Sequence, residues 1–396
     1  MASLDVVIVG GCGHVGLPLA LALADRGLDV CSYDLDAAAV ALVNGGEMPF
    51  LEPGAPEVLA RVLESGRFRA STEQTTISTA ENVIVVIGTQ VDEHLNPDLS
   101  NVQKALESIA SNFVDGQLLV LRSTVYPGVT ALIERLVDRL GTDVDVSFCP
   151  ERIAEGKALV ELYELPQIVA SRSPRALDRA SKLFRNLTSE IVLLEPEEAE
   201  LAKLFTNVWR YIRFATANQL YMMANDFGLD YEKIRQALSQ NYPRAAELPG
   251  AGFTAGPCLF KDTMQLAAFN NNNFPLGQAA MMVNEGLPLY MVARLEQHHD
   301  LSTMTVGILG MAFKGESDDI RSSLSYKLKR ILRFKADRVL THDPYVTVDS
   351  DLDPLDTVLA ESDLLIIAAP HAMYRDVEAA APIIDIWDLR EDGVKV

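Results

Sequence analysis

Glycines near the start of the chain are the first residues whose types and spacing could do chemistry. The run Gly11-x-Gly13-x-x-Gly16 stands between a β-branched segment at 4–10 and a Leu- and Ala-rich segment at 17–26. Glycines at this spacing between a strand and a helix permit a tight turn and close approach of a pyrophosphate, which the helix N-terminus stabilises. An ordinary strand-to-helix turn is the alternative, but the motif's position favours dinucleotide binding.

An acidic residue supports the same interpretation. Asp34 ends the next predicted strand, at 30–34. A carboxylate at this place accepts hydrogen bonds from both ribose hydroxyls of a dinucleotide and repels a 2′-phosphate. The two features together predict NAD, rather than NADP, as the cofactor.

A second group of reactive residues follows a loop rich in glycine and alanine. The loop at 250–257 leads into Cys258, and Lys261 and Asp262 come directly after it. Such a loop lets a substrate approach the backbone, and a thiol beside a cation and a predicted helix start is a candidate nucleophile. A lone cysteine is more often a small buried hydrophobic residue, so these residues alone leave both readings open.

Two further pairs of polar residues have spacings that could matter. Lys203 and Asn207 are four residues apart on a predicted helix and therefore share a face. Glu151 and Glu155 follow a predicted strand at 144–149, and ligands of open α/β sheets bind beyond the carboxyl ends of strands. From these residues alone, a solvated lysine with a neutral asparagine explains the first pair better, and two surface glutamates explain the second pair equally well.

Metal binding is not expected. The six histidines show no ligand spacing, and the adjacent His298 and His299 would point apart on a helix. Cys12 and Cys31 lie inside the predicted nucleotide fold, where we interpret them as packing residues.

The composition excludes several classes of protein. The chain has 396 residues, 48% of them apolar, and a formal charge of −21. Without a long basic run, such a chain is not expected to bind nucleic acid or a membrane surface, and its apolar runs are too short to span a membrane. The N-terminus lacks the basic segment of a signal peptide, and four cysteines make no disulfide framework, so we expect a cytoplasmic protein.

The order of the predicted elements defines the fold class. Strands alternate with helices up to about residue 194, helical patterns follow from Pro196 to about 295, and alternation resumes at 305. We therefore predict an α/β protein in which a central helical domain joins two Rossmann-like parallel-sheet domains. The expected domains are 1–194, 195–298 and 299–396. The predicted strands after 30–34 are 82–88, 117–122, 144–149, 167–170, 305–310, 338–343, 364–369 and 383–386.

These motifs, taken in order, resemble the UDP-glucose/GDP-mannose dehydrogenase family over nearly the whole chain. Each segment alone could be chance, whereas the complete series in the right order is specific. The matching segments are 9–18, 92–100, 122–128, 150–152, 200–203 with Asn207, 256–262, 309–314 and 318–321.

The resemblance implies a reaction. Members of the family oxidise the C6 primary alcohol of a nucleotide sugar to a carboxylate and reduce two NAD per sugar. By this resemblance Cys258 would form a thiohemiacetal and then a thioester, and Lys203 would stabilise the oxyanion. Asn207 and Asp262 would hold the hydrolytic water, and Glu151 would be the general base. Thr124 would support the water or the nicotinamide side.

The resemblance also implies binding residues and an assembly. The C-terminal domain would bind UDP, and a long central helix would form a homodimer. The residues expected at the cofactor are Gly11, Gly13, His14, Val15, Gly16, Asp34, Thr89, Thr124, Lys261 and Arg321. Those expected at the nucleotide sugar are Glu151, Arg152, Glu155, Lys203, Asn207, Arg244, Phe253, Gly256, Phe313 and Lys314.

The sugar itself is left open by a hybrid pattern. The stretch 241–244 resembles the branch that oxidises N-acetylhexosamines, whereas Lys261 and Asp262 resemble the UDP-glucose branch. Gly256 and Pro257, just before the cysteine, match neither branch. We expect UDP-glucose or a UDP-N-acetylhexosamine as the substrate.

Three other functions are compatible with parts of the sequence. A two-electron dehydrogenase of the 6-phosphogluconate or hydroxyacyl type needs neither a nucleophilic thiol nor the α/β segment at 305–390. A non-catalytic NAD-binding protein would be supported by loss of an essential group, but all the expected groups are present. A UDP-sugar epimerase uses Tyr-x-x-x-Lys, which this sequence does not contain.

Overall fold

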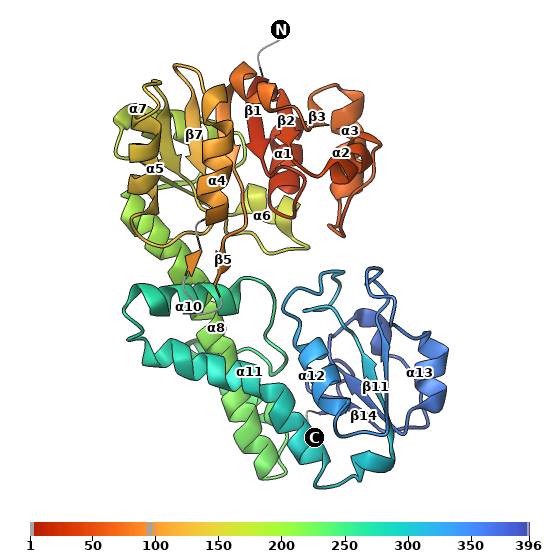
Figure 1. Cartoon of the computed structure of the whole chain (residues 1–396). Coiled ribbons are helices and arrows are strands. Elements are labelled where there is room, and N and C mark those ends of the chain that lie inside the picture. The colour runs from red at the N-terminus through yellow and green to blue at the C-terminus, as the bar shows by residue number, and fades with distance from the viewer. Residues whose placement is uncertain (1–3, 93–96, 99, 394–395) are drawn as a thin grey trace. The chain divides into compact units, whose positions relative to one another are not determined.

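The computed structural model describes residues 4–92, 97–98, 100–393 and 396. The chain divides into two compact units, Met1–Thr206 and Asn207–Val396, whose elements are shown in Figure 1. The division falls inside one long helix, and the three domains expected with boundaries at 194 and 298 stay a prediction. The motif at 92–100 lies largely outside the described residues.

An eight-stranded sheet forms the centre of the first unit, in the order β10-β9-β8-β7-β4-β1-β2-β3. The six strands from β3 to β8 run parallel, as predicted. β9 runs antiparallel to β8 through the pair Phe148 and Ala170, and β10 is parallel to β9, so the sheet is mixed at one end. The strands are β1 (Leu4–Val9), β2 (Val30–Tyr33), β3 (Phe68–Ser71), β4 (Ala80–Val85), β7 (Leu118–Leu121), β8 (Asp145–Phe148), β9 (Gln167–Ala170) and β10 (Ile191–Leu194).

Helices cover both faces of this sheet (Figure 1). Successive strand residues point to opposite faces, so Val6 and Ile8 pack with α1, α2, α3, α6 and α7, whereas Val7 and Val9 pack with α4 and α5. Burial on both faces explains why the central strands are continuous apolar runs. The helices are α1 (Gly16–Asp25), α2 (Ala37–Asn44), α3 (Ala55–Glu64), α4 (Ser100–Ile109), α5 (Val129–Asp138), α6 (Ala158–Glu164) and α7 (Pro174–Phe184).

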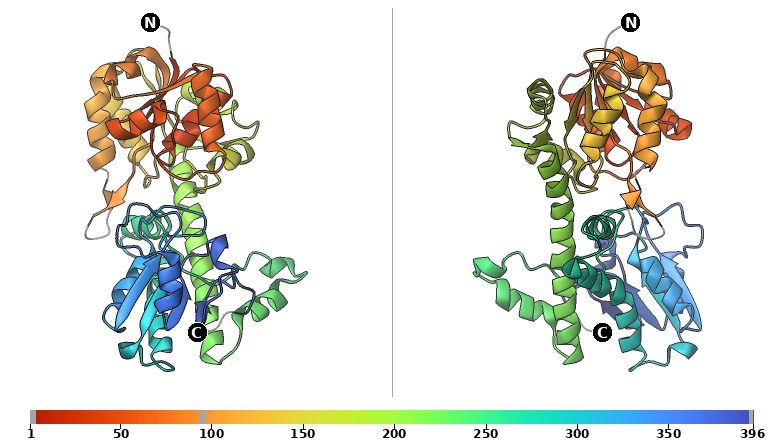
Figure 2. Two further views of the ribbon diagram at one scale, coloured as in Figure 1. Left: turned by 90° about the vertical axis from the view of Figure 1, so that its right-hand side faces the viewer. Right: turned by 60° about the vertical axis from the view of Figure 1, so that its left-hand side comes forward.

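One long helix, α8 (Pro196–Asp226), begins at the proline that the sequence marks as a helix start, and both views of Figure 2 show it along its length. Proline suits a first helical turn because its missing N–H has no helical partner there. Residues 195–298, all of them described, contain helices and turns and no strand, as predicted. The other helices of this segment are α9 (Tyr231–Ser239), α10 (Leu259–Phe269) and α11 (Pro275–Leu295).

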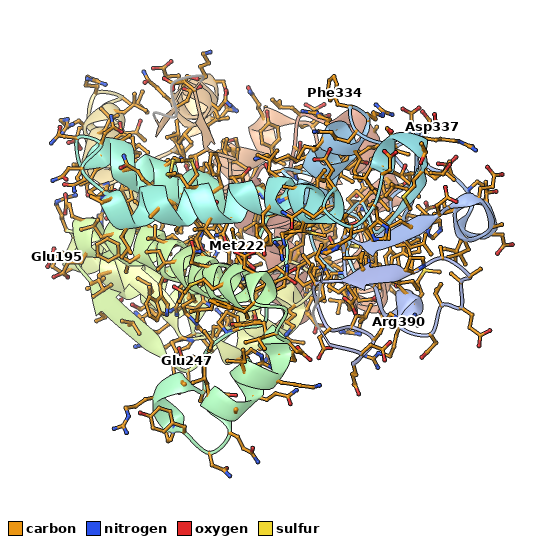
Figure 3. All side chains as sticks on the ribbon, turned by 90° about the horizontal axis from the view of Figure 1, so that it is seen from below. Glu195, Met222, Glu247, Phe334, Asp337 and Arg390 are labelled. Atoms are coloured by element: carbon orange, nitrogen blue, oxygen red, sulfur yellow. The ribbon has the colours of Figure 1, made fainter. Side chains whose placement is uncertain are left out.

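A four-stranded parallel sheet forms the rest of the second unit, in the order β12-β11-β13-β14. One apolar cluster joins this sheet and α12 to α8 and α11, and Met222 packs against it (Figure 3). The elements are β11 (Thr305–Leu309), α12 (Leu324–Leu332), β12 (Arg338–His342), α13 (Leu355–Glu361), β13 (Leu364–Ile367) and β14 (Ile383–Asp385). With the six parallel strands of the larger sheet, this arrangement confirms the predicted α/β fold, in which helices join two sheets that are largely parallel.

Some elements were not predicted. β3 and β10 are the outermost strands of the large sheet, and Val192 and Leu193 of β10 are exposed. A short antiparallel pair, β5 (Gln90–Val91) and β6 (Pro97–Asp98), was also missed. Among the described residues, no helix is long and apolar enough to cross a membrane.

Candidate active site

The glycine turn between β1 and α1 is shaped partly by the chain's own packing. A Cβ atom on Gly10, Gly11 or Gly16 would lie 2.3 to 2.7 Å from backbone oxygen atoms, and Gly10 has a φ of +77°. A Cβ on Gly13 would meet only one atom, the Gly10 oxygen at 3.9 Å, and Gly13 is exposed. Packing therefore requires the other glycines, whereas position 13 leaves room for an outside group, as a pyrophosphate needs.

The carboxylate of Asp34 lies beside this turn. Its Oδ2 accepts the backbone N–H of Cys12 at 3.0 Å, and its Oδ1 accepts that of Asp36 at 3.1 Å. Asp34 thus ties the end of β2 to the glycine turn. Burial and the nearby Asp34 raise the pKa of the Cys12 thiol to about 12, which fits the predicted packing role. The glycine turn and Asp34 together fit a bound NAD.

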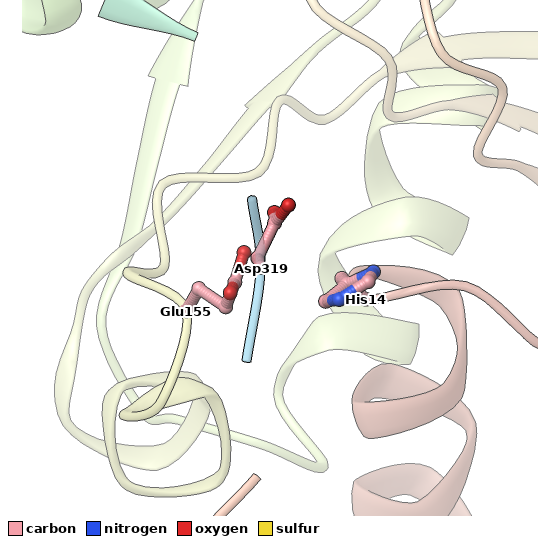
Figure 4. Close-up of side chains that lie close together, drawn as sticks. All are labelled: His14, Glu155 and Asp319. Carbon is pink, nitrogen blue, oxygen red and sulfur yellow. The ribbon is translucent and has the colours of Figure 1, made fainter. Parts of the chain in front are cut away.

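The sequence predicts that His14 contacts the cofactor and that Glu155 contacts the substrate. Both residues belong to the first unit, and Figure 4 shows their side chains. The His14 ring stacks on Phe50 with their centroids 4.1 Å apart. Glu155 lies on the loop before α6, and this loop is fixed from a distance because Glu52 accepts the N–H groups of Gly156 and Ala158, each at 2.8 Å. Glu52 was missed because nothing local in the sequence links it to a loop about 100 residues away.

The loops after β4 and β7 lie at the same edge of the sheet, since both strands are parallel. The hydroxyl of Thr89 donates to the carbonyl of Thr124 at 2.8 Å, and the Ser123 hydroxyl accepts the N–H of Ile87 at 2.8 Å. The structure therefore brings Thr89 and Thr124, two residues predicted at the cofactor, into direct contact.

Glu151 follows β8 and is buried against Arg122. The guanidinium of Arg122 is fully buried and donates to Glu151 Oε2 through Nε at 2.8 Å and through a second nitrogen. Glu151 Oε1 accepts the N–H groups of Arg152 at 2.7 Å and Ile153 at 3.0 Å. The surface reading of this glutamate is wrong, because both of its oxygens are held inside the protein.

Arg152 lies on the same loop. Its guanidinium donates to the carbonyl of Pro166, and partial burial lowers its pKa. The neighbouring Ala154 N–H donates to Glu161 at 2.6 Å. Arg152 thereby helps to fix the loop that carries Glu151 and Glu155.

Lys203 and Asn207 lie one turn apart on α8, as predicted. Both are buried, with 8% and 4% of their surface exposed, so the solvated-lysine reading is wrong. The Asn207 amide donates to Asp262 Oδ2 at 2.5 Å, which joins α8 to α10 within the second unit.

Near the start of α8, Glu200 accepts the N–H groups of Gly128 and Thr130, each at 2.7 Å, and so satisfies free N–H groups at the N-terminus of α5.

Cys258 is the exposed member of the four cysteines. Burial raises the pKa of Cys31 and raises that of Cys149 to about 11, so these thiols stay protonated. Cys258 occupies the N-cap position of α10, where the helix dipole and free N–H groups favour a thiolate. The exposure and position of Cys258 therefore suit a nucleophile, and the buried-packing alternative is wrong.

Asp262 lies in the first turn of α10 and is fully buried. Its Oδ2 accepts from Asn207, and its Oδ1 lies 3.3 Å from the Lys261 ammonium. No described residue donates a hydrogen bond to Oδ1. This oxygen can therefore accept a hydrogen bond from a further donor such as water.

The loop before Cys258 packs against the segment that follows β11. A Cβ on Gly256, whose φ is +98°, would lie 2.7 Å from the ring of Phe313. The Gly256 N–H donates to the Ser322 carbonyl at 3.4 Å. The Lys314 ammonium lies 5.5 Å from the centre of the Phe313 ring. Gly256, Phe313 and Lys314 are thus neighbours, as a shared role at the nucleotide sugar requires.

Phe253, Arg244 and Arg321 were also predicted at the substrate or the cofactor, and each has its own partners within the second unit. Phe253 is 2% exposed and packs in the apolar cluster of the second unit. Arg244 lies in a short 3-10 helix, and its Nε donates to the Tyr242 hydroxyl at 2.8 Å. Arg321 is held by two hydrogen bonds from its Nε to Asp319, at 3.0 and 2.8 Å.

In the second sheet, Asp343 accepts backbone N–H groups of the loop after β11, as Asp34 accepts one from the turn after β1. Asp343 follows β12, and its Oδ2 accepts the N–H groups of Met311 at 2.7 Å and Ala312 at 2.9 Å. His371 Nε2 lies 3.0 Å from the same oxygen, and both side chains are fully buried. Asp343 therefore fixes the loop at 310–316 from within the protein.

Comparison with known proteins agrees with this geometry. Residues 5–188, 197–286 and 307–390 match the NAD binding, central and UDP binding domains of the UDP-glucose/GDP-mannose dehydrogenase family. The UDP-N-acetyl-D-mannosamine dehydrogenase of Pyrococcus horikoshii is 30% identical over 384 residues, which cover 94% of this chain and 90% of that protein.

Two solved structures share the fold over almost the whole chain. The UDP-D-ManNAc dehydrogenase of Pyrococcus horikoshii has a TM-score of 0.91 at 28% identity and covers 98% of this chain and 97% of its own. A UDP-glucose dehydrogenase of Pyrobaculum islandicum has the same TM-score at 26% identity and covers 100% and 97%. The chain therefore belongs to the UDP-glucose/GDP-mannose dehydrogenase family of NAD-dependent nucleotide-sugar dehydrogenases.

Proposed function

We propose that the protein oxidises C6 of UDP-N-acetyl-D-mannosamine to the uronic acid through a covalent intermediate on Cys258. The observation that carries this proposal is the exposed Cys258 at the N-terminus of α10, with Asp262 in the first turn of the same helix and hydrogen-bonded to Asn207 of α8. The names of the relatives and the sequence at 241–244 support an N-acetylhexosamine over glucose.

The proposed reaction passes through two covalent intermediates on Cys258. NAD, when bound, supplies the hydride acceptor for each of the two oxidations. The Cys258 thiolate adds to the C6 aldehyde and forms a C–S bond, and the resulting thiohemiacetal is oxidised to a thioester. Water then attacks the thioester carbonyl, the C–S bond breaks, and the sugar leaves as a carboxylate while Cys258 is restored as a thiolate. The alcohol, two NAD⁺ and one water thus give the carboxylate, two NADH and three protons.

Hydrolysis needs a positioned water and a stabilised oxyanion. Asp262 keeps one oxygen without a hydrogen bond from any described residue, and Asn207 holds the other, so this pair is suited to orient the water. We assign to the Lys203 ammonium, one turn before Asn207 on α8, the stabilisation of negative charge on the substrate oxygen.

The general base of hydrolysis is proposed to be Glu151. Its Oε2 faces Arg122, and its Oε1 accepts two backbone N–H groups. A carboxylate bound in this way can take a proton from water only when one of these hydrogen bonds gives way. We therefore propose that substrate binding frees one oxygen of Glu151, while Arg122 keeps the carboxylate in place.

The substrate is tested by a panel of nucleotide sugars. Purified protein with excess NAD would receive UDP-ManNAc, UDP-GlcNAc, UDP-GalNAc, UDP-glucose or GDP-mannose, and the products would be identified by mass. We expect the uronic acid from UDP-ManNAc, with kcat/KM at least tenfold above the others. A higher kcat/KM for UDP-glucose would contradict the proposed sugar and leave the reaction class intact.

A further inference from the structure

A buried asparagine holds the loop that leads into Cys258. Asn218 lies on α8 and is fully buried. Its Oδ1 accepts the N–H of Gly252 at 2.9 Å, and its Nδ2 donates to the carbonyl of the same Gly252 at 3.0 Å. One side chain thus satisfies both backbone groups of one residue, six positions before the thiol, and so fixes that residue in two directions.

A second buried asparagine keeps Asn218 in this orientation. Asn218 Nδ2 also donates to Asn284 Oδ1 at 3.0 Å, and Asn284 Nδ2 donates to the carbonyl of Tyr211 at 3.1 Å. Asn284 lies on α11 and is also fully buried. Because the carbonyl oxygen of each amide is already in use, neither amide can flip without losing hydrogen bonds.

The ring of Trp387 also packs against Gly252. Gly252 has a φ of +151°, and a Cβ there would lie 2.3 Å from the ring of Trp387. The next anchor of the loop is Gly256, which packs on Phe313. Cys258 is thus the first exposed residue after a buried, doubly anchored stretch.

We propose that Asn218, supported by Asn284, is a positioning residue for the covalent step, because it fixes the loop that places the Cys258 sulfur at the start of α10. This inference rests on the proposed function. The first oxidation requires no thiol, whereas the second requires sulfur at the aldehyde carbon. A loosened loop should therefore leave aldehyde formation in place and let part of the aldehyde escape before the thiol captures it.

The test is the amount of NADH formed per UDP-ManNAc consumed by Asn218→Ala, with the aldehyde trapped by hydroxylamine. We expect the ratio to fall from near two toward one. A structural role alone would reduce the amount of folded enzyme or its melting temperature and leave the ratio at two.

The matched control is Asn225→Ala. Asn225 is also a buried asparagine of α8, but its amide donates to the Tyr290 hydroxyl at 3.0 Å and accepts the N–H of Val396 at 3.0 Å. We expect this variant to lose stability and keep the ratio near two. A ratio of two in folded Asn218→Ala, or an equal fall in Asn225→Ala, would overturn the inference.

Two further measurements cover the remaining outcomes. If Asn218→Ala does not fold, Asn284→Ala removes only the side chain that supports Asn218, so it should lower the ratio less. An unchanged ratio in Asn284→Ala would overturn the positioning role of Asn218. A wild-type ratio near one would contradict the proposed function itself. The positioning role of Asn218 would then be tested by alkylation with iodoacetamide, which reaches Cys258 selectively because the other three thiols are buried. Asn218→Ala should slow the alkylation of Cys258 severalfold, and Asn225→Ala should leave its rate unchanged. Equal rates in the two variants would overturn the inference.

Discussion

Among single residues, one thiol differs from the other three, and the proposed reaction depends on it. Cys258 is exposed at a helix N-terminus, whereas burial raises the pKa of Cys12 and Cys149. We predict that Cys258→Ser lowers the rate of uronic acid formation at least about 1,000-fold and leaves at most a slow first oxidation. Mass analysis of the product measures this effect. Cys149→Ala is the control and should retain turnover, and an equal loss in both variants would contradict the assignment.

The buried pair of Arg122 and Glu151 leads to a stability prediction. Arg122→Met would leave the Glu151 carboxylate buried without its counter-ion, so we expect a loss of about 3–5 kcal/mol in the free energy of unfolding, measured with urea. The control is Arg338→Met, which breaks an exposed pair with Glu361 and should cost less than about 1 kcal/mol. Equal losses in the two variants would show that the Arg122 pair does not stabilise the fold.

At the scale of elements, Asp343 connects β12 to the loop after β11. Burial opposes its charge, but hydrogen bonds from His371 and from the N–H groups of Ala312 and Tyr345 outweigh burial and lower its pKa from 3.8 to about 2. Because the folded-state pKa is lowered, this stability is present above pH 3.8 and is lost as the pH falls toward 2.

We therefore predict that Asp343→Asn lowers the free energy of unfolding by about 2 kcal/mol at pH 7. The difference from wild type should shrink as the pH falls below about 4, because Asp343 of the unfolded chain then takes up a proton while the folded-state carboxyl stays charged until about pH 2. Denaturation curves at pH 7, 4 and 3 measure this change. A difference that stays constant across this range would contradict the role of the charged form.

The elements predictable from the sequence are those with a strong local signal. β1, β7 and β13 are buried on both faces and read as continuous apolar runs, and Pro196 marks the start of α8. β3 and β10 lie at the sheet edges, where burial is incomplete and the apolar pattern is weak. The reversed direction of β9 also has no local signal, because it depends on the path of the chain after β8.

The candidate site divides in the same way. Motif spacing indicated Gly13, Asp34, Cys258 and the pair of Lys203 and Asn207. The supporting residues were not found, because Glu52 and Asn218 act on backbone groups far away in the sequence. A hydrogen bond between distant segments leaves no spacing pattern in a single chain.

At the scale of the whole molecule, we propose a homodimer formed through the helical segment. Trp209 and Met223 of α8 are 57% and 53% exposed, and Phe227 just after it is 80% exposed. Large apolar side chains gathered on one segment are typical of an interaction surface. We expect sedimentation to give twice the chain mass of 43.3 kDa.

The double change Met223→Glu with Phe227→Glu should shift the protein toward monomer, because charged side chains would be buried in the interface. Phe334→Glu is the control, since this residue is 89% exposed and lies after α12, away from α8 in the sequence. A wild-type monomer, or a shift to monomer caused by Phe334→Glu, would contradict the proposed surface.

The yield of NADH per sugar distinguishes the proposed covalent four-electron oxidation from a two-electron reaction. Wild-type protein would receive excess NAD and a limiting amount of UDP-ManNAc, and NADH would be measured when the reaction is complete. We predict a ratio near two, with the uronic acid as the product. A ratio near one with a free aldehyde as the product would contradict the four-electron oxidation, because Cys258 would then have no part in the reaction.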